Sequence, residues 1–123
     1  MTSKWVLIID CDEASRIALK RNFEALKLDY QVTTAPDGFR ALGRLLQQPV
    51  DLVLAGDHGP GMDWLELVEA VHEISPQTRI LLIADGDTVE IDEAVKLVEF
   101  DGYIGKSFTL AQIVEMVEQV ITR

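Results

Sequence analysis

The chain has 123 residues, of which 48% are hydrophobic and 26% charged, as expected for one soluble globular domain spanning residues 1–123. Its formal net charge of −10 disfavours binding of this domain to nucleic acid or to an anionic membrane. A single cysteine excludes an internal disulfide framework, and no signal peptide or membrane span is evident, so a cytoplasmic location is expected.

Five short apolar runs predict β-strands. The first, third and fourth are continuously apolar at their centres, which is typical of parallel strands covered on both faces. The second and fifth are more polar or shorter, which favours the edges of a sheet. In chain order the predicted strands are Trp5–Ile9, Tyr30–Thr34, Asp51–Ala55, Arg79–Ala84 and Gly102–Gly105.

Segments with helical spacing of apolar residues follow these strands. Leu42, Leu45 and Leu46 form the apolar stripe of the second helix, which follows Asp37-Gly38 and cannot continue through Pro49. Capping boxes at Asp63 and Thr109 mark the starts of two others. Apolar stripes predict these two helices over residues 67–74 and 110–121, and two further helices over residues 19–26 and 91–98.

Five strand–helix units predict a doubly wound α/β fold, a flavodoxin-like parallel sheet in the order 2-1-3-4-5 with five helices. Ligands of such sheets bind at the carboxyl ends of strands one and three. The residues there are Asp10-Cys11-Asp12-Glu13 and Gly56-Asp57-His58-Gly59. Three carboxylates after the first strand would repel a phosphate group, which argues against a nucleotide binder. A carboxylate cluster facing one lysine, Lys106, instead suits a divalent cation beside a phosphorylated carboxylate.

Nearly the whole chain resembles the receiver domain of two-component response regulators. The resemblance rests on WVLIIDCDEASR, DLVLAGDHGPGMDWLEL and GYIGKSF, which match the family's acidic strand end, phosphoacceptor loop and lysine motif in the right order. It implies phosphoryl transfer from a histidine kinase to an aspartate with Mg²⁺ bound. It also implies a signalling face, or a homodimer, formed by the helix over 91–98, the strand Gly102–Gly105 and the helix over 110–121.

The resemblance is incomplete at the site. Gly56 takes the phosphoacceptor position, Cys11 replaces the second acid, and Ile83 takes the position of the switch hydroxyl. The lysine, Lys106, and the aromatic switch residue, Tyr103, are retained. Ser107 also replaces the proline that usually follows the lysine, and Trp64 replaces a small residue after the loop. The sequence therefore predicts an atypical pseudo-receiver that acts through protein contacts without normal phosphorylation.

Alternatives remain for three side chains. Asp57 could act as a displaced phosphoacceptor, although neighbouring residues of a strand face opposite sides. Asp10 could bind Mg²⁺ or form a structural ion pair with Lys106. Cys11, with His58 nearby, could serve a thiol- or metal-responsive sensor, but a thiolate is a poor ligand for Mg²⁺. Asp12 and Glu13 are predicted to cap the first helix.

No nucleophile–base pair or cofactor loop is evident, so an enzyme is not expected. The expected partners are proteins: a histidine kinase, an output domain or another signalling protein. Mg²⁺ is the one cofactor that the resemblance implies, and the lost ligands predict that its binding is weakened.

Overall fold

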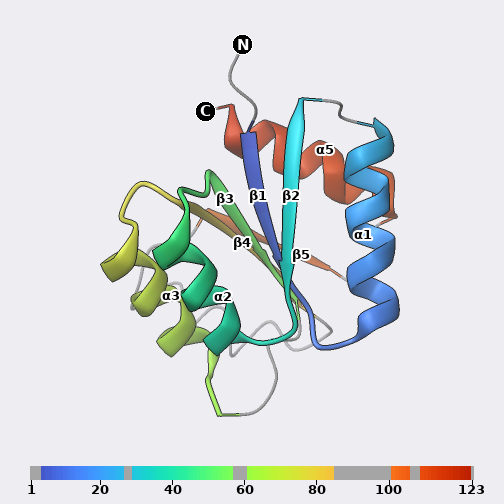
Figure 1. Ribbon diagram of the computed structural model, residues 1–123. Coiled ribbons are helices and arrows are strands. Elements are labelled where there is room, and N and C mark those ends of the chain that lie inside the picture. Colours follow the sequence, from blue (N-terminus) through green and yellow to red (C-terminus); the bar gives the residue numbers. More distant parts are fainter. Residues whose placement is uncertain (1–3, 27–28, 57–60, 85–100, 106–108, 123) are drawn as a thin grey trace.

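One parallel sheet organises the molecule, with its strands in the order β2-β1-β3-β4-β5 (Figure 1). The computed structural model describes residues 4–26, 29–56, 61–84, 101–105 and 109–122. The order is the one predicted from the sequence, with β2 and β5 at the edges. The strands are β1 (Lys4–Ile9), β2 (Tyr30–Ala35), β3 (Leu52–Ala55), β4 (Arg79–Ala84) and β5 (Gly102–Gly105).

The described helices cover both faces of this sheet (Figure 1). Helices α1 (Glu13–Leu26) and α5 (Leu110–Ile121) lie on one face. Helices α2 (Gly38–Gln47) and α3 (Trp64–Ile74) lie on the other. The predicted helix over residues 91–98 falls outside the described residues, so the described part of the chain holds four of the five expected helices.

Alternation along each strand divides the apolar residues between two cores. Val6 and Ile8 of β1 face α1 and α5, whereas Leu7 and Ile9 face α2 and α3, and all four are fully buried. This explains the continuous apolar runs of the central strands, because both faces of the sheet are covered. Phe23 of α1 is fully buried in the first core, where its ring lies 6.0 Å from that of Tyr30.

Side-chain caps fix where three of the helices begin. The predicted capping boxes are confirmed at Asp63 and Thr109, where Glu66 and Gln112 complete the reciprocal bonds. Asp37 caps α2 by accepting from the backbone N–H of Arg40. This bond lowers the pKa of Asp37, because it stabilises the carboxylate.

At the amino end of the sheet, an aspartate bonds three neighbouring strands to one another. The sequence predicts that this residue, Asp51, lies inside the third strand. Strand β3 begins at Leu52, one residue later than predicted, and Asp51 precedes it. Its Oδ2 accepts the backbone N–H of Trp5 at 2.8 Å, and its backbone bonds both Trp5 and Arg79. One residue therefore ties the starts of β1, β3 and β4 together.

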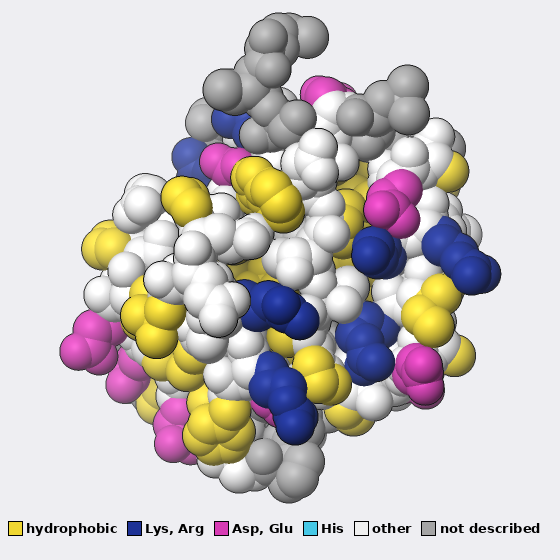
Figure 2. Space-filling view, viewed as in Figure 1, with side chains coloured by type: hydrophobic (Ala, Val, Ile, Leu, Met, Phe, Trp, Pro, Cys, Tyr) yellow, Lys and Arg dark blue, Asp and Glu magenta, His cyan; other side chains and the backbone are white. Residues whose placement is uncertain are grey.

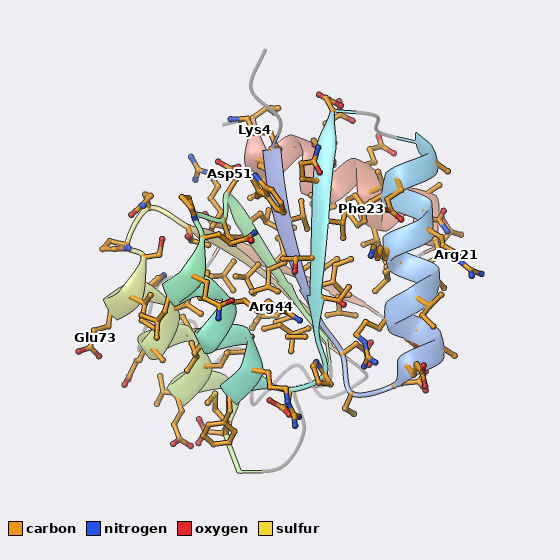
Figure 3. All side chains as sticks on the ribbon, in the orientation of Figure 1. Lys4, Arg21, Phe23, Arg44, Asp51 and Glu73 are labelled. Atoms are coloured by element: carbon orange, nitrogen blue, oxygen red, sulfur yellow. The ribbon has the colours of Figure 1, made fainter. Side chains whose placement is uncertain are left out.

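A second aspartate acts similarly between β4 and β5. The backbone N–H of Ile80 donates to Asp101 Oδ2 at 2.7 Å, and the Asp101 N–H donates to Ile80 O at 2.9 Å. Arg79 also forms an ion pair with Asp101 at 3.3 Å. Lys4 and Asp51 mark this end of the sheet in Figure 3.

Candidate functional site at the carboxyl end of the sheet

Strands β1 and β3 bring Asp10 and Gly56 together at the carboxyl end of the sheet. Ile9 pairs with Ala55 in register, so the two next residues leave the sheet side by side. The backbone N–H of Gly56 donates to Ile9 O at 2.7 Å, which continues the pairing beyond the last strand residues. Gly56 is buried.

The space beside Gly56 is filled by the carboxylate of Asp10. A Cβ atom added to Gly56 would lie 2.9 Å from Asp10 Oδ2 and 3.1 Å from Ile9 O. Gly56 does not have a positive φ, so its backbone conformation does not require glycine. What distinguishes this position is therefore its contact with Asp10, and a side chain here would point at that carboxylate.

Asp10 is held in place by its neighbours along β1 and α1. Its Oδ1 accepts the backbone N–H of Asp12 at 2.9 Å, and its own N–H donates to Ala35 O at 3.2 Å. Arg16 reaches back from α1 and donates from Nη1 to the Asp10 carbonyl at 2.8 Å. The predicted pairing with Lys106 stays a prediction, because residues 106–108 lie outside the described part of the chain.

Arg16 is a site residue that sequence reasoning missed. It lies six residues after Asp10, one turn into the helix that follows the strand. The side chain of a basic residue six positions after a strand end can reach back to the backbone there. This spacing is the sequence feature from which the contact could have been predicted.

Asp12 caps α1, as predicted. Its Oδ2 accepts the hydroxyl of Ser15 at 2.7 Å and the Ser15 backbone N–H at 3.1 Å. The hydroxyl bond is the main cause that lowers the pKa of Asp12, with the backbone bond next. Glu13 follows as the acidic residue of the first turn, where the helix dipole favours it. The carboxylates of Asp12 and Glu13 therefore stabilise the start of α1.

The described donors at this end of the sheet do not make up a Mg²⁺ site. Among residues 4–26, 29–56, 61–84, 101–105 and 109–122, no group of three His, Cys, Asp or Glu side chains could hold a metal ion. Asp10 supplies one carboxylate and Cys11 an exposed thiol, which is soft where Mg²⁺ prefers oxygen. The remaining candidates, Asp57 and His58, lie outside the described residues.

The residues predicted for switching lie on β4 and β5. Ile83 is only 7% exposed and packs in the core formed with α1 and α5. Ala84 follows it and pairs with Gly105. Neither side chain carries a hydroxyl. Tyr103 pairs with Leu82 in register, but its side chain is not among those described, and the same holds for Trp64 at the start of α3.

The fold matches solved structures of receiver proteins over almost its full length. Chemotaxis protein CheY4 of Vibrio cholerae superposes with a TM-score of 0.86 at 25% identity, covering 97% of this chain and 99% of that one. A receiver domain protein of Methanospirillum hungatei gives a TM-score of 0.89 at 22% identity, over 98% and 95% of the two chains. The architecture is thus that of a flavodoxin-like receiver.

The sequence places the chain within a family. The model of the response regulator receiver domain matches residues 6–118, so the chain belongs to this family, that of two-component response regulator receivers. It is 30% identical to the probable chemotaxis protein CheY of Rhizobium etli over 119 residues, 94% of this chain and 90% of that protein. It is 29% identical to sporulation initiation phosphotransferase F of Bacillus subtilis, over 98% and 96% of the two chains.

Some relatives are much longer. Hydrogenase transcriptional regulatory protein HoxA of Cupriavidus necator is 27% identical over 94% of this chain, which spans only 24% of that protein. No helix among the described residues has the length and apolar character needed to cross a membrane.

Proposed function

We propose that this receiver domain signals through protein contacts without phosphorylation at the usual position. The observation that carries the proposal is Gly56 at the end of β3, where a side chain would point at Asp10. An acyl phosphate forms when a carboxylate oxygen attacks phosphorus, and glycine offers no such oxygen. The domain would then hold one state that its partners recognise.

Two further substitutions support the same function. The exposed thiol of Cys11 stands beside Asp10 where the family resemblance implies a second acid. The hydrocarbon side chain of Ile83 packs in the core and offers no hydroxyl to a phosphoryl group. Three parts of one mechanism would thus be replaced in a domain whose buried core is complete on both faces of the sheet.

The proposed partners are a histidine kinase, an output domain or another signalling protein. The proposed contact face includes β5 and α5, together with the segment 91–98 that lies outside the described residues. A homodimer through this face is the other arrangement that the family resemblance suggests.

Phosphorylation on Asp57 is the first alternative. Asp57 directly follows the buried Gly56 in the sequence, and Gly59 and Gly61 are residues that would permit its carboxylate to turn inward. The register of a strand opposes this, since adjacent side chains face opposite sides. If Asp57 is the acceptor, Mg²⁺ must bind as well.

A thiol- or metal-responsive sensor is the second alternative, and the exposure of Cys11 favours it. An exposed thiol is open to oxidants and to soft metals. Its neighbours in the chain, Asp10 and Asp12, are acidic, whereas reactive thiols usually stand in electropositive surroundings. Loss of any response to peroxide or zinc in Cys11→Ser would be required by this alternative.

The experiment that separates these functions is intact-mass measurement after incubation with acetyl phosphate and Mg²⁺. We expect no phosphoryl adduct on the unmodified sequence or on Asp57→Asn. An adduct that disappears in Asp57→Asn would make Asp57 a displaced acceptor and overturn the proposal. An adduct that persists there but disappears in Asp10→Asn would also overturn it, with Asp10 as the acceptor.

A further inference from the structure

The basic side chains of this acidic chain are concentrated at one edge of the sheet. Residues 13–48, from α1 through α2, contain six basic and four acidic side chains, whereas the rest of the chain contains five and seventeen. Figure 2 shows Lys and Arg side chains in a band across the face drawn, over α2, the edge strand β2 and α1. A protein with a net charge of −10 thus gathers basic side chains on this face.

Strand β2 leaves one side of its backbone directed away from the sheet. Asp29 O and Ala35 O accept hydrogen bonds from Lys4 and Asp10, so the odd-numbered residues of this segment face β1. The even-numbered residues, Tyr30 and Val32 among them, therefore point their N–H and C=O groups away from the sheet, whereas the C=O of Thr34 on the same side is already bonded to Arg44 of α2. Such an edge is a template for a further strand.

Arg44 lies over this edge from α2. Its Nε donates to Thr34 O at 3.0 Å, which holds the guanidinium beside the strand (Figure 3). Arg40, one turn earlier on the same side of α2, is 70% exposed and pairs with Asp37 at 2.6 Å. Two guanidinium groups and one carboxylate therefore line the approach to β2.

A hollow of about 290 Å³ lies between these arginines on α2, with Gln47 completing its lining. Its floor is Gly43, where an added Cβ would meet no atom within 4 Å. Glycine inside a helix lowers helix stability relative to alanine, and here no close packing contact requires it. Its effect is to open the surface between Arg40 and Arg44.

We propose that this edge binds an extended acidic segment of a partner protein, which adds a strand beside β2. The segment would alternate acidic and apolar residues, because the two faces of a strand differ. Its carboxylates would meet Arg40 and Arg44 over the α2 side, and its apolar residues would lie beside Val32, which is partly buried against α1 and α5. This surface is separate from the proposed β5–α5 contact and does not depend on how Asp10 or Asp57 behaves.

The test uses a fluorescein-labelled peptide with the sequence Glu-Val-Glu-Val-Glu-Val-Glu and measures its binding by fluorescence anisotropy at low ionic strength. We expect Arg44→Glu to weaken binding by about tenfold or more, because a charge pair becomes a repulsion. The matched control is Arg21→Glu, an equal change of charge on the outer side of α1 (Figure 3), with an expected effect of about twofold or less. Circular dichroism confirms that each variant is folded.

A second pair of variants tests the hollow without changing charge. Gly43→Leu would fill it and weaken peptide binding, whereas Gly43→Ala would leave most of the space. N-methylation of alternate peptide amides would abolish binding if the backbone adds to β2. We expect weaker binding to Gly43→Leu and no binding of the methylated peptide. Normal binding of the methylated peptide would overturn strand addition.

Three other outcomes would overturn the proposal. One is an equal loss of binding in Arg21→Glu, which would indicate a general effect of net charge. Another is tighter binding of an oligothymidine of matched charge, which would indicate nucleic acid. The third is a dimer in sedimentation velocity that Arg44→Glu dissociates without peptide present, which would make a second copy of this chain the occupant.

Discussion

At the amino end of the sheet, Asp51 and Asp101 join neighbouring strands through their carboxylates, whereas at the carboxyl end Asp10 leans into the space beside a glycine. The first two accept from backbone N–H groups of other strands and are partly buried. Asp10 accepts from Asp12, only two residues away. Aspartate therefore supports the fold at one end of the sheet and belongs to the candidate site at the other.

The difference shows which part of the molecule is free to change. The amino end supplies hydrogen bonds that the strands need, so substitution there acts on stability. At the carboxyl end the bond described above for the Asp10 carboxylate is a local one, from the Asp12 N–H, so its substitution should cost the sheet less than substitution of Asp51. Four predictions test this contrast.

The largest effect is expected for Asp51→Ala. It leaves the backbone N–H of Trp5 without its partner in a partly buried position, and loss of a bond to a charged group costs about 1.5–3 kcal/mol of unfolding free energy. Urea denaturation measures the change. Asp29→Ala, an exposed aspartate before β2, is the control and should change stability by less than about 0.5 kcal/mol. Equal effects of the two substitutions would remove the contrast between Asp51 and an ordinary surface aspartate.

The second effect concerns Tyr30 at the start of β2, also at the amino end. Burial is the main cause that raises its pKa to about 12, with Glu118 and Asp29 adding to it. The folded pKa exceeds the unfolded value of 10, so its contribution to stability is fully present below pH 10 and is lost between pH 10 and 12. We expect the urea midpoint to fall more steeply over this range than in Tyr30→Phe.

Absorbance titration of the phenols provides the independent check. The chain has two tyrosines, so the difference between the unmodified protein and Tyr30→Phe assigns the signal. A phenol at position 30 that ionises at its ordinary pH would contradict the prediction.

The third prediction compares glycines directly. Gly56→Ala places a Cβ atom 2.9 Å from Asp10 Oδ2, and such overpacking costs about 1–2 kcal/mol. Gly43→Ala meets open space in a helix and should stabilise by about 0.5–1 kcal/mol. Opposite signs for the same chemical change are the expected result in denaturant titrations.

A double-mutant cycle tests whether Asp10 is the cause. In an Asp10→Ala background, Gly56→Ala should lose much of its cost, with a coupling of about 1 kcal/mol. Additive effects would show that the backbone contact with Ile9 O matters instead.

The smallest effect is expected at Asp12, the exposed cap of α1. Its pKa is lowered in the folded state, so its contribution is present above the unfolded value of 3.8 and is lost as the pH falls through the lower folded value. Asp12→Asn keeps a capping oxygen but removes the charge. The variant should therefore show a shallower loss of stability with acid below about pH 4. Identical acid profiles would contradict this.

Much of the fold could be predicted because its signals are local. Central strands show as continuous apolar runs, and the starts of α3 and α5 show as capping boxes at Asp63 and Thr109. The structural role of Asp51 could not be predicted in this way. Local sequence indicates only a polar residue at the start of a strand, whereas its bond to Trp5 joins residues 46 positions apart in the chain.

The strand ends that carry Asp10 and Gly56 could be predicted, but the contact between the two residues could not. The spacing from Asp51 and Pro60 indicates that Gly56 ends a strand, whereas its approach to Asp10 depends on the register of β1 with β3. Likewise, nothing in the spacing of α2 indicates that Arg44 reaches Thr34 on β2. Such contacts depend on how elements pack, which periodicity does not encode.

The position of Asp10 has a consequence for engineering this domain. Because its carboxylate lies in the space that a side chain at position 56 would enter, an aspartate introduced there would meet the Asp10 carboxylate first. Asp10 would have to withdraw before the new side chain could settle. Building a carboxylate into position 56 would thus take two changes, one at position 56 and a compensating one at or around Asp10.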